Sequence, residues 1–128
     1  MPGTVRTVSA VHQIMIFFKK ECWSNIFVPH GPPPRSGHAS AVIPQGGGQI
    51  VIHGGEYSSK NGETFYHYKD MWALSLDGKK SKWEEIKVKG GPSSRSGHRM
   101  AYFNKKLIVF GGFHERIKDY CYFNDIYS

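Results

Sequence analysis

Three groups of residues have types that could do chemistry: the histidines, two serines that precede histidines, and a run of glycines. The seven histidines form neither a His-x-His nor an HExxH spacing, so no zinc-type ligand set is predicted. Ser36 and Ser96 each lie two residues before a histidine, but neither stands in a Gly-x-Ser-x-Gly turn. The glycines at 46–48 lack the Gly-Lys-Ser/Thr sequence that a phosphate-binding loop requires. We therefore predict no catalytic, cofactor-binding or metal site.

Two of the histidines, at 53 and 67, form a further candidate pair. His53 and His67 flank the same predicted loop and could approach one another across it. Two histidines alone are more often structural than metal-binding, so we assign them no metal. Both serine–histidine pairs also recur along the chain, whereas a catalytic residue is usually unique.

The motifs around these candidates repeat in a fixed order. The repeated motifs are Arg-Ser-Gly-His at 35–38 and 95–98, an apolar run into Gly-Gly at 50–55 and 107–112, and Asp-x-aromatic at 70–72 and 125–127. Trp23 and Trp83 each stand 12 residues before the arginine of the next motif. Because such spacing rarely arises by chance, the chain is predicted to be a repeat protein.

Short strands separated by turns are predicted within each repeat. The predicted strands span residues 38–43, 49–52, 70–76, 83–88, 98–103 and 107–110. Each is rich in apolar or β-branched residues and is bounded by glycine, proline, asparagine or charged residues. No window shows a sustained helical period of 3.6 residues. The predicted fold class is therefore all-β.

A four-stranded unit with these motifs resembles the kelch repeat, whose units are antiparallel blades of a β-propeller. The finer similarity is to the kelch-domain-containing protein four family, and it is carried by the segments 44–49, 61–63, 65–70 and 111–114. At about 50 residues per kelch blade, the 128 residues make an incomplete propeller of about 2.5 blades.

The resemblance also divides the chain. Residues 1–22 are predicted to be a divergent N-terminal segment with one strand at 14–18, and residues 23–128 to be kelch repeats. Within the repeats we expect the end of one blade at 23–30, a full blade at 31–90 and a partial blade at 91–128. We expect the chain to be a fragment or short isoform of a longer propeller, and the isolated chain to self-associate through open blade edges.

The repeated residues are assigned structural roles. The structural set is Arg35, Gly54, Gly55, Asp70, Trp83, Arg95, Gly111, Gly112 and Asp125. The glycines permit a positive φ, the tryptophan supplies buried area, and the aspartates are expected to bind local backbone N–H groups. We expect replacement of Trp83 by alanine to damage the fold, and replacement of His38 or His98 to change little.

Composition narrows the environment and the partners. The longest apolar run, residues 14–18, is too short to cross a membrane, and no secretory signal is predicted. Only two cysteines are present, so a reducing compartment, the cytoplasm or the nucleus, is expected. The net charge of +7 includes lysines at 79, 80, 82, 87, 89, 105 and 106. We interpret them as solvated edge residues in preference to a nucleic-acid site.

The predicted function is a non-catalytic protein-interaction scaffold without a cofactor. Partner binding is placed on two long aromatic loops, 56–69 and 113–124, at Tyr57, Phe65, Tyr66, Tyr68, His114, Tyr120 and Tyr122. The alternative role for these rings is to cover the neighbouring blade. The alternative functions are an enzyme built on a propeller, as in galactose oxidase, and a basic protein associated with nucleic acid.

Overall fold

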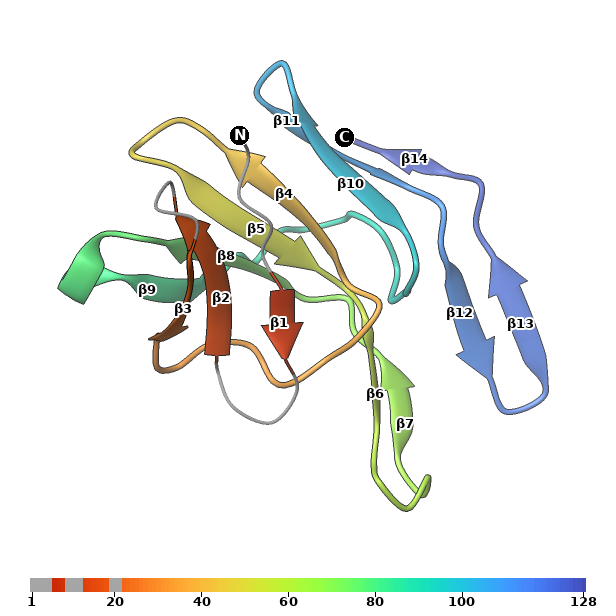
Figure 1. Ribbon diagram of the computed structural model, residues 1–128. Coiled ribbons are helices and arrows are strands. Elements are labelled where there is room, and N and C mark those ends of the chain that lie inside the picture. The colour runs from red at the N-terminus through yellow and green to blue at the C-terminus, as the bar shows by residue number, and fades with distance from the viewer. Residues whose placement is uncertain (1–5, 9–12, 19–21) are drawn as a thin grey trace.

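Three antiparallel sheets follow one another along the chain, and each is a blade of a β-propeller (Figure 1). The computed structural model describes residues 6–8, 13–18 and 22–128. The first sheet contains β1 (Arg6–Val8), β2 (Gln13–Phe18) and β3 (Cys22–Phe27). The second, in the order β4-β5-β8-β9, contains β4 (Ala39–Ile43), β5 (Gln49–His53), β8 (Met71–Ser75) and β9 (Lys82–Glu85). The third contains β10 (Arg99–Phe103), β11 (Lys106–Phe110) and β14 (Ile126–Tyr127).

The all-β prediction is confirmed, and the predicted strands match the observed ones to within a few residues. The largest difference is at β9, which ends at Glu85 although the prediction continued to Val88. Ile86 donates one further backbone hydrogen bond to Met71, at 2.8 Å. The chain then leaves the sheet, and Val88 is 62% exposed. Without a partner strand or a buried face, the apolar residues beyond Glu85 do not extend the strand.

The two long loops are hairpins. β6 (Glu56–Ser58) pairs with β7 (Phe65–His67), and β12 (Phe113–Arg116) pairs with β13 (Asp119–Tyr122). Cross-strand aromatic contact, such as that between Tyr57 and Tyr66 at 5.5 Å, stabilises a short two-stranded ribbon. Both hairpins project from the same end of their blades, at the bottom of the view in Figure 1.

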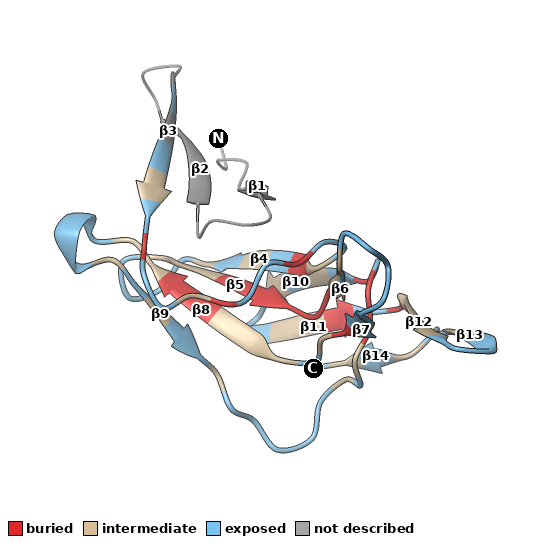
Figure 2. Ribbon diagram, turned by 90° about the horizontal axis from the view of Figure 1, so that it is seen from below, coloured by how far each residue is buried: buried red, intermediate tan, exposed pale blue. Residues whose placement is uncertain are grey.

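The core lies in the middle strands of the complete blade (Figure 2). Val51 and Ile52 of β5, and Ala73 and Leu74 of β8, are all buried. These neighbours alternate between the two faces of the sheet, so both faces of the blade are covered there. Trp83 of β9 packs against the same core.

Adjacent blades are joined through their first strands and the turns before them. β4 and β10 lie side by side. Gly55 donates a backbone hydrogen bond to Arg95 at 2.9 Å, and Arg95 donates one to Tyr68 at 3.2 Å. Gly97 donates to Gly37 at 2.8 Å. Gly54 has a φ of +67°, and an added Cβ would lie 2.6 Å from the backbone oxygen of Arg95 in the next blade. Only glycine fits this seam.

The N-terminal strand expected at 14–18 is present as β2, paired with β3. Residues 1–5, 9–12 and 19–21 lie outside the described residues. The division at residue 22 and the blade boundaries stay predictions.

Trp83→Ala is expected to lower the free energy of unfolding by about 3 kcal/mol, because truncating a large core ring leaves a cavity. The matched control is Trp23→Ala, at the equivalent position of the first blade, where the tryptophan is 50% exposed. Denaturant unfolding of the full chain measures both. Equal losses in the two variants would contradict the assignment of Trp83 to the core.

Candidate functional site

An arginine binds an aspartate within each of the second and third blades. The guanidinium of Arg35 donates to both carboxylate oxygens of Asp70, one of them at 2.8 Å, and to the Gly54 carbonyl at 3.0 Å. It also lies 3.8 Å above the centre of the Tyr68 ring. Trp72 Nε1 donates to the same carboxylate at 2.7 Å. The aspartate was predicted to bind local backbone N–H groups; its own backbone N–H does contribute to a lowered pKa, but the hydrogen bonds from these side chains contribute more.

The next blade repeats the arrangement with equivalent residues. Arg95 donates to both carboxylate oxygens of Asp125, at 2.6 and 3.1 Å, and to the Gly111 carbonyl at 2.9 Å. Its guanidinium lies 3.9 Å above the centre of the Phe123 ring. A buried arginine whose donors are filled in this way is a structural anchor and not an available ligand-binding cation.

The two hairpins meet at His67, a residue that the sequence did not mark as functional. Its side chain is fully buried. The ring packs against Phe113 at 5.6 Å and His114 at 4.7 Å, measured between centroids. Nδ1 lies 2.7 Å from Ser96 Oγ, and Nε2 accepts the backbone N–H of Glu115 at 2.9 Å. Three of these contacts fix one hairpin against the other, and the fourth, to Ser96, fixes His67 to the turn before β10.

The hydrogen bonds determine the protonation state of His67. Because Nε2 accepts a backbone N–H, it carries no proton, and Nδ1 must then donate to the Ser96 hydroxyl. Burial and the neighbouring His114 lower the pKa of His67, although Glu56 and Glu115 oppose the shift. The contact between the hairpins thus requires the neutral imidazole.

The structure brings the seven predicted partner-binding residues to one end of the two blades but gives them different roles. Phe65, Tyr66, Tyr120 and Tyr122 are exposed, with exposed fractions between 40% and 78%. Tyr57, Tyr68 and His114 are half-buried. Tyr68 supports the Arg35 guanidinium. His114 Nδ1 donates to the Ser94 carbonyl at 2.8 Å.

Strand register separates the exposed rings into two faces. Tyr66 pairs with Tyr57, so these two rings share a face, which Tyr68 extends. Phe65 and His67 lie on the opposite face, toward the following blade. Tyr120 and Tyr122 occupy the repeat positions of those two residues. Their face is therefore where a further blade would pack, whereas the tyrosine face of the first hairpin points away from it.

A second histidine contact joins the blades near their centre. His53 Nδ1 and His98 Nε2 are 2.9 Å apart, and both residues are buried. Burial is the main cause that lowers the pKa of each to about 4, and Arg95 lowers both further. The expectation that His98 is dispensable is therefore not supported by its position. The expected approach of His53 to His67 is replaced by this contact.

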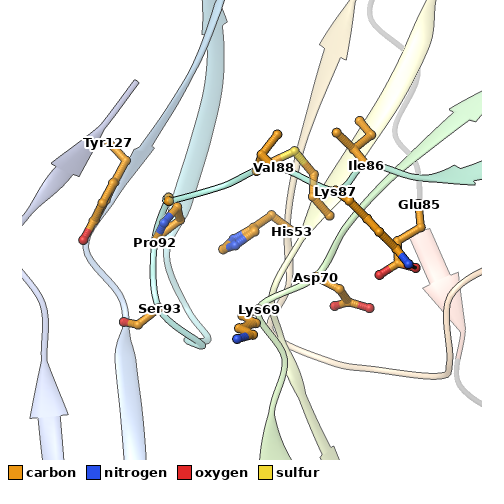
Figure 3. Close-up of a pocket in the computed structure, with 13 residues that line it drawn as sticks. His53, Lys69, Asp70, Glu85, Ile86, Lys87, Val88, Pro92, Ser93 and Tyr127 are labelled. Carbon is orange, nitrogen blue, oxygen red and sulfur yellow. Dashed lines mark ion pairs between the residues drawn. The ribbon is translucent and has the colours of Figure 1, made fainter.

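A cavity of about 590 Å³ lies between the complete blade and Tyr127 of the next (Figure 3). Its lining includes the side chains of His53, Lys69, Asp70 and Lys87. The Asp70 carboxylate is already held by its arginine. Among the described residues, no three histidine, cysteine or acidic side chains gather to hold a metal ion. No helix among the described residues is long and apolar enough to cross a membrane.

Comparison with known proteins gives a consistent family. Residues 3–128 match the model of the KLHDC2/KLHL20/DRC7 Kelch-repeats domain. The chain is 35% identical to the dynein alpha chain of the flagellar outer arm of Chlamydomonas reinhardtii, over 75% of this chain and 2% of that protein. It is 32% identical to Adagio-like protein 1 of Oryza sativa, over 73% of this chain and 14% of that protein.

A third relative and a solved structure agree. Tip elongation aberrant protein 1 of Schizosaccharomyces pombe is 32% identical, over 74% of this chain and 7% of that protein. The chain thus spans only a small part of these relatives. The solved structure of YjhT superposes with a TM-score of 0.58 at 21% identity, covering 80% of this chain and 29% of that one. This last likeness shows the fold.

Acid is expected to destabilise the protein through the histidines between the blades. The pKa of His53 and His98 is about 4 in the folded chain and about 6.5 in the unfolded chain. Their stabilising contribution is complete above pH 6.5 and is lost as the pH falls to 4, by up to about 1.4 kcal/mol per pH unit for each histidine.

The test compares urea unfolding from pH 7 to pH 4 in the wild type and in His53→Phe/His98→Leu. Phenylalanine is chosen because Phe110 stands at the position of His53 in the next blade. The free energy of unfolding should fall less steeply with pH in the double variant. His30→Asn, at an exposed histidine with a φ of +59°, is the control and should follow the wild type. If the double variant keeps the wild-type slope, the pair does not titrate as described.

Proposed function

Because the chain belongs to the kelch-repeat family, we propose that it is a non-catalytic protein-interaction domain. The partner binds the two-hairpin surface, which comprises residues 56–67 and 113–122. The supporting observation is the tyrosine face of the first hairpin, where Tyr66 is 44% exposed beside Tyr57 and Tyr68. Solvent-exposed tyrosines on a rigid framework are typical anchors of protein interfaces.

The hairpins are held in place without a partner. His67 fixes β7 to β12, and Tyr66 and Tyr68 share a hydroxyl contact of 3.0 Å. A surface that is ordered in advance loses little conformational entropy on binding. This favours a binding role over the alternative in which the rings only cover the neighbouring blade.

The finer assignments are also proposals. Within the kelch-repeat family we favour the kelch-domain-containing protein four group, on the segments 44–49, 61–63, 65–70 and 111–114. We place the protein in the cytoplasm or the nucleus, since the free thiol of Cys121 suits a reducing compartment. Its partners are proteins, bound without a cofactor.

The test compares proteins that co-purify with the wild type and with Tyr57→Ala/Tyr66→Ala, which removes two neighbouring rings from the tyrosine face of the first hairpin. Loss of an interface anchor often costs 2 kcal/mol or more, roughly thirtyfold in affinity. Partners recovered with the wild type should be depleted with this variant. Val42→Ala/Phe110→Ala, at exposed apolar residues outside the hairpins, should retain them. If the hairpin variant folds normally by circular dichroism and retains every partner, the proposed surface is wrong.

A further inference from the structure

Lysine pairs lie at the end of the blades opposite the hairpins. Each β-strand of the complete blade runs from one end to the other, so the β4–β5 and β8–β9 turns share the end that the hairpins do not occupy. The β10–β11 turn is at this end too, because Tyr102 next to it donates to Gln45 Oε1 in the β4–β5 turn at 2.7 Å. The turns carry Lys79 and Lys80 in one blade and Lys105 and Lys106 in the next. We call these four residues the lysine end.

The lysine end differs electrostatically from the other lysines in the same region. Lys82 lies 3.2 Å from a carboxylate of Glu84, and Lys87 lies 3.8 Å from one of Glu85. These two fit the interpretation as solvated edge residues on and after β9. Within the part of the chain that the structure describes, no ion pair involves any of the four lysines of the lysine end. Asp77 is the only acidic residue in the two turns.

The turns present the lysines from ordered backbone. Lys79 and Lys80 lie in a 3-10 turn, η1 (Gly78–Lys80), which Ser81 closes by donating to the Gly78 carbonyl at 2.7 Å. In the other turn, Asn104 and Lys105 both have positive φ, of 49° and 61°. Two successive residues with positive φ form the tight turn that suits a β-hairpin. The lysines therefore leave the backbone at defined positions of the two turns.

The sequence repeats this feature. Lys19 and Lys20 precede Lys79 and Lys80 by 60 residues, the same interval that separates the two tryptophans Trp23 and Trp83. They fall between β2 and β3, as the later pair falls between β8 and β9. Residues 19–21 are outside the described part of the chain, so the repeat supports the pattern but not the geometry.

We propose that the lysine end binds an acidic segment of a protein partner, at a surface separate from the two-hairpin surface. Four lysines that form no ion pair among the described residues attract a run of aspartate and glutamate residues, and the attraction falls with added salt. A polypeptide is favoured over nucleic acid because the four residues are all lysines, one adjacent pair at each of two turns. The guanidinium forks that read phosphates in pairs are absent from these two turns.

The experiment measures binding of a fluorescent twenty-residue oligoglutamate to the full chain by anisotropy, at low and physiological salt. The variant is Lys79→Gln/Lys80→Gln/Lys105→Gln/Lys106→Gln. The matched control, Lys60→Gln/Lys87→Gln/Lys89→Gln/Lys118→Gln, removes the same charge away from these two turns. Binding should weaken about tenfold in the first variant and change less than about threefold in the control.

Three results would overturn the proposal: no oligoglutamate binding by the wild type, equal loss in the two variants, or tighter binding of a duplex DNA of equal charge through the same four lysines. The last result would assign the surface to nucleic acid. Circular dichroism and unfolding of each variant must match the wild type before its affinity is compared. Tyr57→Ala/Tyr66→Ala should bind oligoglutamate normally, which separates this surface from the one on the hairpins.

Discussion

The buried arginine at the start of each blade is the constraint on which the rest of the structure depends. Arg95 uses its guanidinium within its own blade, on Asp125 and the Gly111 carbonyl, and its backbone on the preceding blade, at Gly55 and Tyr68. One residue therefore determines both the fold of a blade and its distance from the next. Burying its charge is tolerated because the carboxylate and carbonyl oxygens replace the lost water. Removing the aspartate alone would leave an unpaired cation in the seam.

The same interaction keeps the aspartate ionised. Burial raises the pKa of Asp70, but the hydrogen bonds from Arg35 and Trp72 outweigh that effect, so its pKa is lowered. For Asp125 the hydrogen bond from Arg95 is the largest cause of a lowered pKa. The carboxylate also begins the third strand of the blade, directly after the hairpin. Anchoring it fixes the point from which the hairpin departs, so the candidate binding surface is positioned by residues that lie outside it.

Sequence alone could predict what the repeat encodes. Gly-Gly, the Arg-Ser-Gly-His motif and the strands recur in register, and the blades follow from them. The histidine contacts between blades could not be predicted, because each involves one residue that differs between the copies. His53 stands where the next copy has Phe110, and His67 stands where it has Tyr122. Such departures from the repeat were the available signal, since a histidine that replaces an aromatic residue can add a hydrogen bond to the same packing. His98 itself is repeated as His38, so the sequence does not indicate that it has a partner in the neighbouring blade.

Antiparallel strands also explain why one small chain can present two unlike surfaces. In each blade the connections alternate between the two ends. Residues in successive turns therefore lie at opposite ends of the blade, and residues in every second turn lie at the same end. The aromatic hairpins follow the second strand of each blade, whereas the lysine turns follow the first or the third. Insertions at one kind of turn lengthen a hairpin without disturbing the other end, because the strands between them are held by the core and by the arginine anchors. The binding surfaces can therefore change independently while the blade is kept.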